Sequence, residues 1–247
     1  MKSLNLLTPL LATILGSIGM FPAAAAAEKS DGHDVVGDPY PLATCPVTGK
    51  ALDAMGEPII KVINGRELRF CCEGCPPKVE AEPAKYLEKV DAAIAELQRP
   101  FYPLERCIVS GEELGSMGKP LELIHGNRLV RLCCAGCVKK FEADPASFLS
   151  KIDEAVVKAQ KESYPLDFCI VSGDKLGGDM GKTIDVTIGN RLYRVCCKGC
   201  IKSLHETPLK YQSMLDDALA GKPVKRPEGS GSKETAKGHG DHEHGDH

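Results

Sequence analysis

One motif of six residues occurs three times in this chain of 247 residues: an apolar residue followed by Cys-Cys-x-Gly-Cys. A further cysteine precedes each copy in the frame Cys-(Pro/Ile)-Val-(Thr/Ser)-Gly. The 12 cysteines therefore fall into three sets of four, with none left over: Cys45, Cys71, Cys72 and Cys75; Cys107, Cys133, Cys134 and Cys137; and Cys169, Cys196, Cys197 and Cys200. Thiols grouped in this way are either metal ligands or paired disulfides. Any fold of this chain has to accommodate three such clusters.

The cysteine sets belong to a longer internal repeat. The tripeptide Tyr-Pro-Leu begins at Tyr40, Tyr102 and Tyr164, at equal spacing along the chain. A fixed period of this length predicts like modules in series, each with its own site. We assign a linker at 28–39, three modules at 40–99, 100–161 and 162–220, and a tail at 221–247.

The N-terminus has the pattern of a signal peptide over 1–27. Lys2 supplies the positive charge, Leu4 to Met20 is mostly apolar, and Ala23 to Ala27 offers the small residues that a signal peptidase reads. The apolar run is shorter than the about 20 residues that a bilayer requires, and polar residues dilute it. We therefore expect cleavage within Ala25 to Ala27 and a mature protein that is free in the periplasm or secreted, with no membrane contact. Such an oxidising compartment favours disulfides.

Composition narrows the classes of partner. The net charge is -3 and the chain has no long Lys/Arg run, so nucleic acid is not an expected partner. Aromatic residues make up 5% of the chain and Trp is absent, so the cores must be small. Small modules with little apolar surface to bury usually need a metal ion or disulfides for stability.

Within a module the residues predict a loop, a β-hairpin and two helices, hence an α+β fold. In the first copy, 58–63 and 66–71 read as strands, and Asn64-Gly65 supplies the positive φ angles of a tight turn. Gly-Asn pairs serve the same turn in the other copies. A short helix is expected from near Gly74, and a second begins at a proline: Pro83, Pro145 or Pro208. Asp144 and Thr207 precede two of these prolines and are candidate caps.

The arrangement of the thiols leaves two ligand sets open. Adjacent side chains on a strand point to opposite faces, so Cys71 and Cys72 can both face the site only if one of them lies beyond the regular strand. The start of a helix near Cys75 favours thiolate, which is the form that binds metal. Four converging sulfurs suit Zn(II), whereas three in a trigonal arrangement suit Cu(I) better.

Two other features recur in every copy. Met55, with Met117 and Met180, either places a thioether near copper or caps a small core. The strand arginines either offset the charge of a thiolate cluster or face solvent; they are Arg66, Arg69, Arg128, Arg131, Arg191 and Arg194. The lone His125 and His205 have no counterparts in the first copy and are not expected to be ligands.

The motif order resembles the YHS/TRASH group of metal-binding domains. The matching residues in the first copy are Cys45-Pro-Val-Thr-Gly, then Arg69-Phe70-Cys71-Cys72-Glu73-Gly74-Cys75, then Val79, Pro83 and Tyr86-Leu87; the second copy matches with Phe141, Pro145 and Phe148. The resemblance spans 40–219 in three copies. It implies a treble-clef-like fold and a role in heavy-metal transport or sensing, and it places the family's cysteines on Cys45, Cys71, Cys75 and their repeats.

The chain departs from that family pattern at two positions. Where many members carry a second cysteine in the opening loop, this chain has Thr48, Ser110 or Ser172. The outer thiols Cys72, Cys134 and Cys197 are additional. Either the additional thiol replaces the missing ligand or the site keeps three sulfurs.

The tail differs in composition from the modules. Lys222 to Lys237 has no periodic apolar residues and is expected to be disordered. The last residues carry imidazoles between carboxylates, which bind Zn, Cu or Ni weakly. These are His239, His242, His244 and His247. The alternative is a tail that only improves solubility.

Together these patterns predict an exported protein that binds a soft metal, Cu(I) or Zn(II), at about one ion per repeat. It would sequester the metal or pass it to a metal transporter or a metalloprotein client, and it would not be an enzyme. The first alternative is a secreted repeat scaffold stapled by disulfides. The second is a thiol-disulfide oxidoreductase that uses Cys72-x2-Cys75, although no thioredoxin-like βαβ pattern accompanies it.

Overall fold

The computed structural model describes residues 37–178 and 181–228, which belong to one compact unit. The predicted signal peptide, most of the linker, Met180 and the histidine-rich end of the tail lie outside the described residues. Within the described ranges, no helix has the length and apolar composition needed to cross a bilayer.

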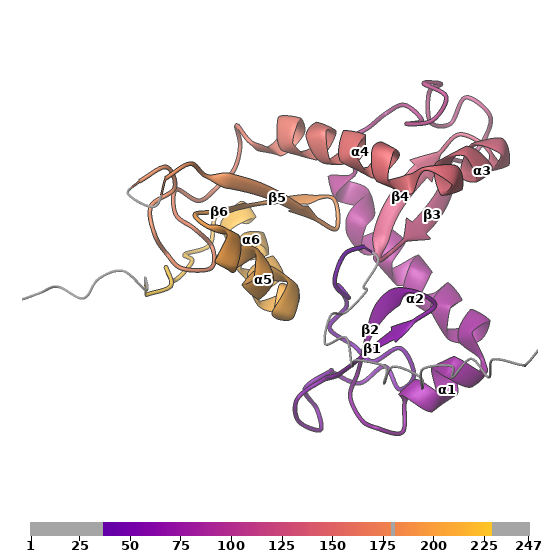
Figure 1. The fold of residues 1–247 in the computed structure, drawn as a ribbon, viewed down its shortest axis with the longest axis horizontal. Coiled ribbons are helices and arrows are strands. Elements are labelled where there is room, and N and C mark those ends of the chain that lie inside the picture. Colours follow the sequence, from indigo (N-terminus) through magenta and orange to yellow (C-terminus); the bar gives the residue numbers. More distant parts are fainter. Residues whose placement is uncertain (1–36, 179–180, 229–247) are drawn as a thin grey trace, which may run out of the picture. The chain divides into compact units, whose positions relative to one another are not determined.

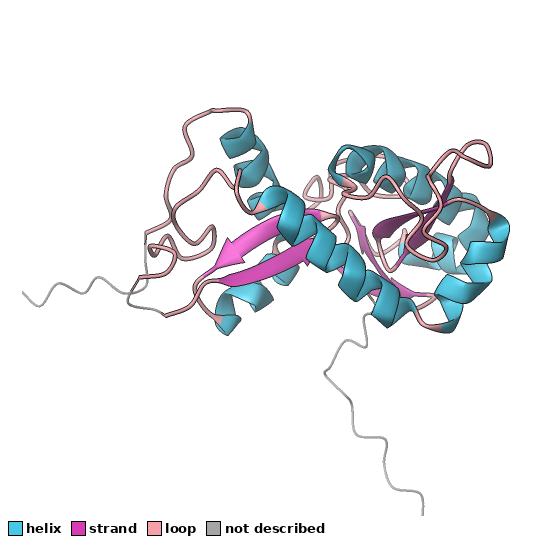
Figure 2. Cartoon of the chain, turned by 90° about the horizontal axis from the view of Figure 1, so that it is seen from above, coloured by secondary structure: helices cyan, strands magenta, loops and turns pink. Residues whose placement is uncertain are grey.

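Three modules follow one another, and each contains an opening loop, a two-stranded antiparallel hairpin and two helices (Figures 1 and 2). The first has β1 (Ile59–Ile63), β2 (Arg66–Phe70), α1 (Pro76–Ala81) and α2 (Pro83–Gln98), followed by the 3-10 turn η1 (Arg99–Phe101). The second has β3 (Leu121–His125), β4 (Arg128–Leu132), α3 (Ala135–Ala143) and α4 (Pro145–Gln160). The third has β5 (Ile184–Ile188), β6 (Arg191–Val195), α5 (Lys198–Glu206) and α6 (Pro208–Leu219). The predicted α+β class and the threefold repeat are confirmed.

The hairpins form where the turn residues predict. Each has the same register, with Ile63 opposite Arg66, His125 opposite Arg128 and Ile188 opposite Arg191. Both central residues of each turn have positive φ, as in Asn64 (φ 53°) and Gly65 (φ 74°). This conformation matches the twist of the strands and is tolerated by Asn and Gly.

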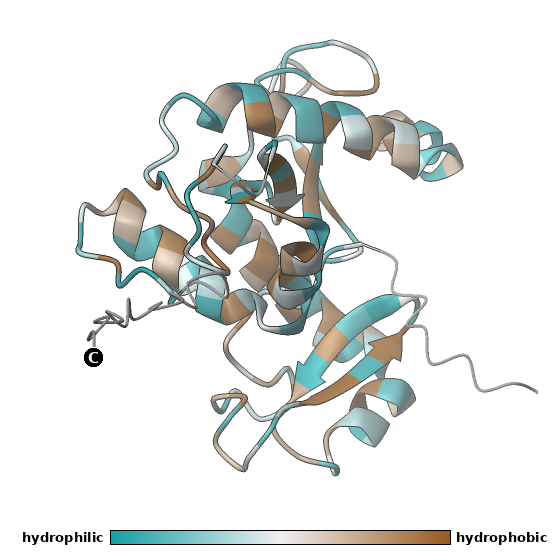
Figure 3. Cartoon of the chain, turned by 60° about the vertical axis from the view of Figure 1, so that its left-hand side comes forward, coloured by the Kyte–Doolittle hydropathy of each residue, from teal (hydrophilic) through white to brown (hydrophobic). Residues whose placement is uncertain are grey.

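The second helix of each module begins at its proline, because a proline at the first helical position loses no intrahelical hydrogen bond. Asp144 caps α4 by accepting from the Ser147 N–H at 3.3 Å. Thr207 does not cap α6 with its side chain; its hydroxyl instead donates to the Ser203 carbonyl. Apolar and polar residues alternate around the helices (Figure 3), and the apolar side contributes Val90 and Ile94 to the first core.

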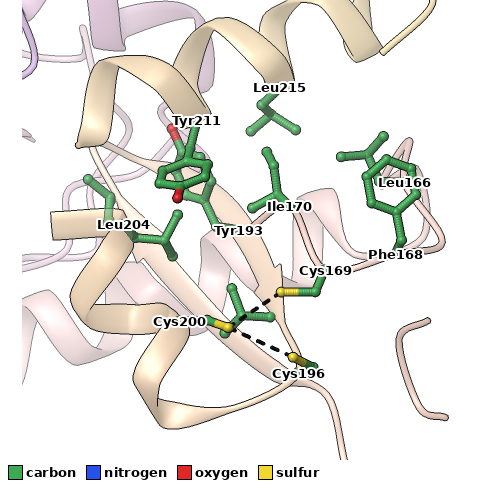
Figure 4. Packing of buried hydrophobic residues seen from close by; sticks show 12 residues of the cluster. Leu166, Phe168, Cys169, Ile170, Tyr193, Cys196, Cys200, Leu204, Tyr211 and Leu215 are labelled. Atoms are coloured by element: carbon green, nitrogen blue, oxygen red, sulfur yellow. Dashed lines mark hydrogen bonds between the residues drawn. The ribbon is translucent and has the colours of Figure 1, made fainter. Parts of the chain in front are cut away.

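Each module has a hydrophobic cluster of its own, and the cysteines are part of it. In the third module, Ile170 and Tyr193 pack with Leu204 and Leu215, and the sulfurs of the cysteines border these side chains (Figure 4). The thiols therefore lie in a setting from which water is largely excluded.

Buried asparagines join successive modules. Asn127, in the second hairpin turn, is 0% exposed; it accepts from the Arg66 guanidinium and donates to the Glu67 carbonyl at 2.8 Å. Asn190 repeats this arrangement with Arg128 (3.1 Å) and the Leu129 carbonyl (2.9 Å). We call these two contacts the asparagine joints. The strand arginines Arg66 and Arg128 are thus buried rather than solvated.

A glutamine at the end of the preceding long helix supports each joint. Gln98 donates to the Asn127 carbonyl and accepts from the Leu129 N–H, both at 2.8 Å. Gln160 makes the equivalent bonds to Asn190 (2.9 Å) and Leu192 (2.8 Å).

Parts of the predicted linker and tail pack against the modules. Asp38 donates its N–H to the Gly126 carbonyl at 2.7 Å and accepts from the Gly189 N–H at 2.6 Å. Gly37, with φ 98°, lies so close to Gly126 that an added Cβ would be 2.3 Å from its carbonyl oxygen, so only glycine fits.

The other end of the described chain contacts the third module. Val224 packs against its core, and Arg226 donates to the Gly173 carbonyl while its guanidinium lies 5.4 Å from the Phe168 ring centroid. The packed structure therefore begins before 40 and continues past 220.

Candidate metal centres

Three sulfurs converge in every module, each set lying within 4.8 Å of one another. The sets are Cys45, Cys71 and Cys75; Cys107, Cys133 and Cys137; and Cys169, Cys196 and Cys200. In each set one cysteine comes from the opening loop, one from just beyond the second strand and one from the start of the first helix. All nine side chains are 0–6% exposed.

The opening loop holds the first sulfur through a tight turn. The Cys45 N–H donates to the Lys50 carbonyl at 2.8 Å, and the Gly49 N–H donates back to the Cys45 carbonyl at 2.9 Å. Gly49 has φ 69°, which explains the glycine of the Cys-x-Val-(Thr/Ser)-Gly frame. The loops at Cys107 and Cys169 have the same bonds.

The point at which the second strand ends explains how two adjacent cysteines can both lie near the site. β2 stops at Phe70, so Cys71 and Cys72 lie beyond the regular strand and need not alternate. The Cys75 N–H then donates to the Cys72 carbonyl at 3.2 Å and starts the turn that leads into α1. In the other modules the third cysteine lies within the first turn of α3 or α5.

The separations between sulfurs suit a bound ion. Cys200 lies 3.7 Å from Cys169 and 3.8 Å from Cys196 (Figure 4), and Cys133 lies 3.7 Å from Cys137. With metal–sulfur bonds of about 2.3 Å, two sulfurs on a tetrahedral ion lie about 3.8 Å apart. These pairs in the second and third clusters therefore have the spacing that a thiophilic ion requires.

The fourth cysteine of each module lies outside the cluster. Cys72, Cys134 and Cys197 are of intermediate burial. Each contacts the third cluster sulfur, at 3.3 Å for Cys72, 3.7 Å for Cys134 and 3.3 Å for Cys197. The structure thus brings together three sulfurs closely and leaves the fourth at the edge.

Hydroxyl groups flank the second sulfur of each cluster. Thr48 Oγ1 lies 3.3 Å from Cys71 Sγ, Ser110 Oγ 3.2 Å from Cys133 Sγ, and Ser172 Oγ 3.3 Å from Cys196 Sγ. Sequence reasoning identified these residues only as substitutions in the family pattern. Their fixed place three residues after the opening cysteine was the available signal.

The third cluster differs in the direction of its hydroxyl. Ser172 Oγ donates to the Asp174 carboxylate at 2.7 Å, so its single proton is not directed at Cys196. Lys50 and Glu112 occupy the equivalent position in the other modules. Burial raises the pKa of Cys196, and the neighbouring Cys169 sulfur adds to the effect.

Hydrogen bonds lower the pKa of the first cysteine of each cluster. Burial raises the pKa of Cys45, but hydrogen bonds from the N–H groups of Cys71, Thr48 and Val47 outweigh it and lower the pKa to about 6.

The same balance acts in the other two modules. Burial opposes ionisation of Cys107, yet hydrogen bonds from the Ser110 hydroxyl and N–H lower its pKa to about 6, and similar bonds lower the pKa of Cys169. Burial and the neighbouring thiols instead raise the pKa of Cys137 to about 12. Metal ions that bind whole clusters therefore displace protons.

Three other candidates from the sequence, Met55, Met117 and His125, are not members of the clusters that contain the sulfurs. Met55 and Met117 are 67% exposed and are not among the residues of the three hydrophobic clusters, so the expectation that they cap a core was wrong. His125 packs edge-on against the Phe141 ring at 5.4 Å between centroids.

The second arginine of each hairpin binds oxygen atoms. Arg69 bonds to the Glu67 carboxylate and to the carbonyls of His205 and Glu206. Arg131 and Arg194 pair with Glu122 and Asp185.

Comparison with known proteins gave no relative: no family model, no curated protein and no solved structure matches the chain.

Proposed function

We propose that this protein binds one soft metal ion per module, Cu(I) in preference to Zn(II), and sequesters the metal or passes it on. The observation that carries the proposal is the convergence of three buried sulfurs in all three modules. Aliphatic side chains would stabilise a hydrophobic core more than three adjacent thiols do. Three adjacent thiols do, however, provide the donor set that a thiophilic ion selects.

The preference for Cu(I) rests on the number of sulfurs. Three thiolates suit trigonal Cu(I), and the position where a fourth ligand is expected in the opening loop holds a hydroxyl, such as Thr48. Binding of Zn(II) instead would require Cys72 to complete a tetrahedral set.

We further propose that the modules are treble-clef-like domains of the YHS/TRASH type. The order of opening loop, hairpin and helix, with ligands on the loop and at the start of the helix, supports this assignment. It agrees with the motif residues that carry the resemblance, from Cys45 to Tyr86.

The proposal extends to the cellular compartment of the protein and to its partners. The N-terminal pattern supports export to the periplasm or the exterior, where a metal transporter or a metalloprotein would be the client. The histidines from His239 to His247 would add weak capture of metal. The proposed role is binding and transfer rather than catalysis, and it involves no nucleic acid.

Two observations argue against the alternative functions, a disulfide scaffold and an oxidoreductase. All 12 cysteines lie in the described residues and carry free thiols, which favours metal sites over a disulfide scaffold. An oxidoreductase of the thioredoxin type needs a parallel βαβ unit, whereas the strands described here pair in antiparallel hairpins.

Native mass spectrometry of the reduced mature protein, supplied with excess Cu(I), tests the proposal. We expect three bound ions in the clusters after weakly held metal is removed with a mild chelator. Cys75→Ser should leave two ions, and Cys72→Ser serves as the matched control that keeps the cluster intact. Absence of bound metal, together with disulfides in the protein as isolated, would establish the scaffold instead.

A further inference from the structure

The outer cysteine of each module contacts both the cluster and solvent. Cys72, Cys134 and Cys197 are the cysteines of intermediate burial, whereas the nine cluster cysteines are buried. Their sulfurs are absent from the sets in which all members lie within 4.8 Å. They nevertheless lie 3.3–3.7 Å from the third cluster sulfur. Each outer sulfur therefore adjoins a ligand of the proposed ion without surrounding the ion itself.

Local structure fixes this position. Cys134 and Cys197 have extended backbones (φ -159° and -153°) directly before α3 and α5. The N–H of the third cysteine donates to the carbonyl of the outer one, at 3.1 Å from Cys137 and 3.2 Å from Cys200. The outer cysteine therefore directly precedes the helix in the second and third modules. In the first module Cys72 lies before the turn that leads into α1, and its carbonyl accepts the same bond from the Cys75 N–H at 3.2 Å.

Access to the cluster favours the outer sulfur as the first contact. The three cluster sulfurs are almost fully buried, and the hydroxyl of Thr48, Ser110 or Ser172 covers the second of them. An ion that arrives from solvent on another ligand can touch the outer sulfur before any buried one. The third cluster sulfur lies next to that contact.

We propose that Cys72, Cys134 and Cys197 are exchange ligands that hold the ion during transfer and release it once the site is filled. This role rests on the proposed binding of Cu(I). In the first step a bond forms between the outer sulfur and the ion, the bond from the ion to its donor ligand breaks, and the thiol proton passes to water. In the second step the third cluster sulfur bonds to the ion and its proton passes to the outer sulfur, whose bond to the ion breaks. The first and second cluster sulfurs then bond to the ion, and any protons they carry pass to water. The oxidation state of the ion does not change.

The test combines Cys72→Ser, Cys134→Ser and Cys197→Ser in the full mature chain under reducing conditions. Cu(I) is supplied as the complex of a coloured small-molecule chelator, and both the amount bound and the rate of transfer are measured. We expect the variant to bind three ions with an affinity within about tenfold of the wild type, while transfer slows by about tenfold or more. The matched control combines Cys45→Ser, Cys107→Ser and Cys169→Ser, which should abolish tight binding at equilibrium.

The outcomes separate this inference from the proposed function. If the wild type binds no Cu(I), both fail. If the wild type binds three ions and the outer-cysteine variant loses tight binding, the outer cysteines are permanent ligands and the exchange role is wrong. Equal rates of transfer in the wild type and the variant would also overturn it, with the binding function intact. Retention of three ions by the variant shows that its modules are folded.

Discussion

Asn64 is the first residue of the first hairpin turn and Asn127 the second residue of the second turn. Both have positive φ, yet Asn64 is exposed and Asn127 is completely buried. The difference in exposure arises from the residues that pack against each turn. The second turn receives Arg66 and Glu67 of the preceding module, whereas the first turn has no preceding module in the described chain. Asn64 therefore serves only the turn of its own hairpin, whereas Asn127 also joins two modules.

The asparagine joints predict a large difference between two identical substitutions. Asn127→Ala should lower the free energy of unfolding by about 4 kcal/mol, because it strains a positive-φ position and leaves buried polar groups of Arg66 and Glu67 without partners. Asn64→Ala should cost only about 1 kcal/mol, the cost of the backbone strain. Urea unfolding of the reduced, metal-free protein measures both.

Asn127→Gly is the control for that experiment. It keeps the turn conformation and removes only the side-chain bonds, so its stability should fall between those of the wild type and Asn127→Ala. Equal losses for Asn64→Ala and Asn127→Ala would show that the joint contributes no stability.

The supporting glutamines sharpen the same comparison. Gln98 is 2% exposed, whereas Gln160 is only partly buried, although their hydrogen bonds are equivalent. Gln98→Ala should cost about 3 kcal/mol and Gln160→Ala about half of that, since water can reach the groups that Gln160 leaves unpaired. Thermal unfolding of the two variants is the measurement, and the reverse order would contradict the role assigned to burial.

In the third hairpin, the arginine equivalent to Arg66 and Arg128 contacts an aromatic ring instead of the asparagine of a following module. The Arg191 guanidinium lies 3.7 Å from the ring centroid of Phe101, which belongs to η1. Phe101→Leu should reduce stability by about 1 kcal/mol through loss of this cation–π contact. Phe101→Tyr keeps the ring and should be near neutral; a double-mutant cycle with Arg191→Met would show no coupling if the contact is unimportant.

The smallest predicted effect concerns the hydroxyl beside the third cluster. Asp174→Ala removes the carboxylate that takes the Ser172 proton, so the hydroxyl becomes free to donate to the Cys196 thiolate, which lies 3.3 Å away. We expect Cu(I) affinity at the third site to rise by about threefold, as for one weak additional hydrogen bond. Competition titration against a chelator measures it, and unchanged affinity would mean that the direction of the hydroxyl does not matter.

Much of each module was predictable because it is encoded locally. Asn64-Gly65 specified the turn, Pro83 the start of α2, and the opening frame at Cys45 the loop that holds the first sulfur. The burial of Asn127 was not predicted, because it depends on contacts with a different module. The available signal was the change of order from Asn64-Gly65 to Gly126-Asn127 and Gly189-Asn190.

The sequence also did not predict where along the chain the packed structure begins. Asp38 lies in a polar stretch without periodicity, and its hydrogen bonds go to residues far along the chain. The outer position of Cys72 depends on where β2 ends, which a Cys-Cys pair alone does not reveal.

The hydrogen bond from the Gly189 N–H to the Asp38 carboxylate joins positions 151 residues apart, whereas the sulfurs of Cys169 and Cys200 are only 31 apart. Local contacts form early as a polypeptide emerges, and distant ones have to wait. Each thiol cluster can therefore be completed as soon as its own repeat has been released, while closure at Asp38 awaits most of the polypeptide. Under the proposed function, a newly made chain can thus take up its first ions before Gly189 reaches Asp38.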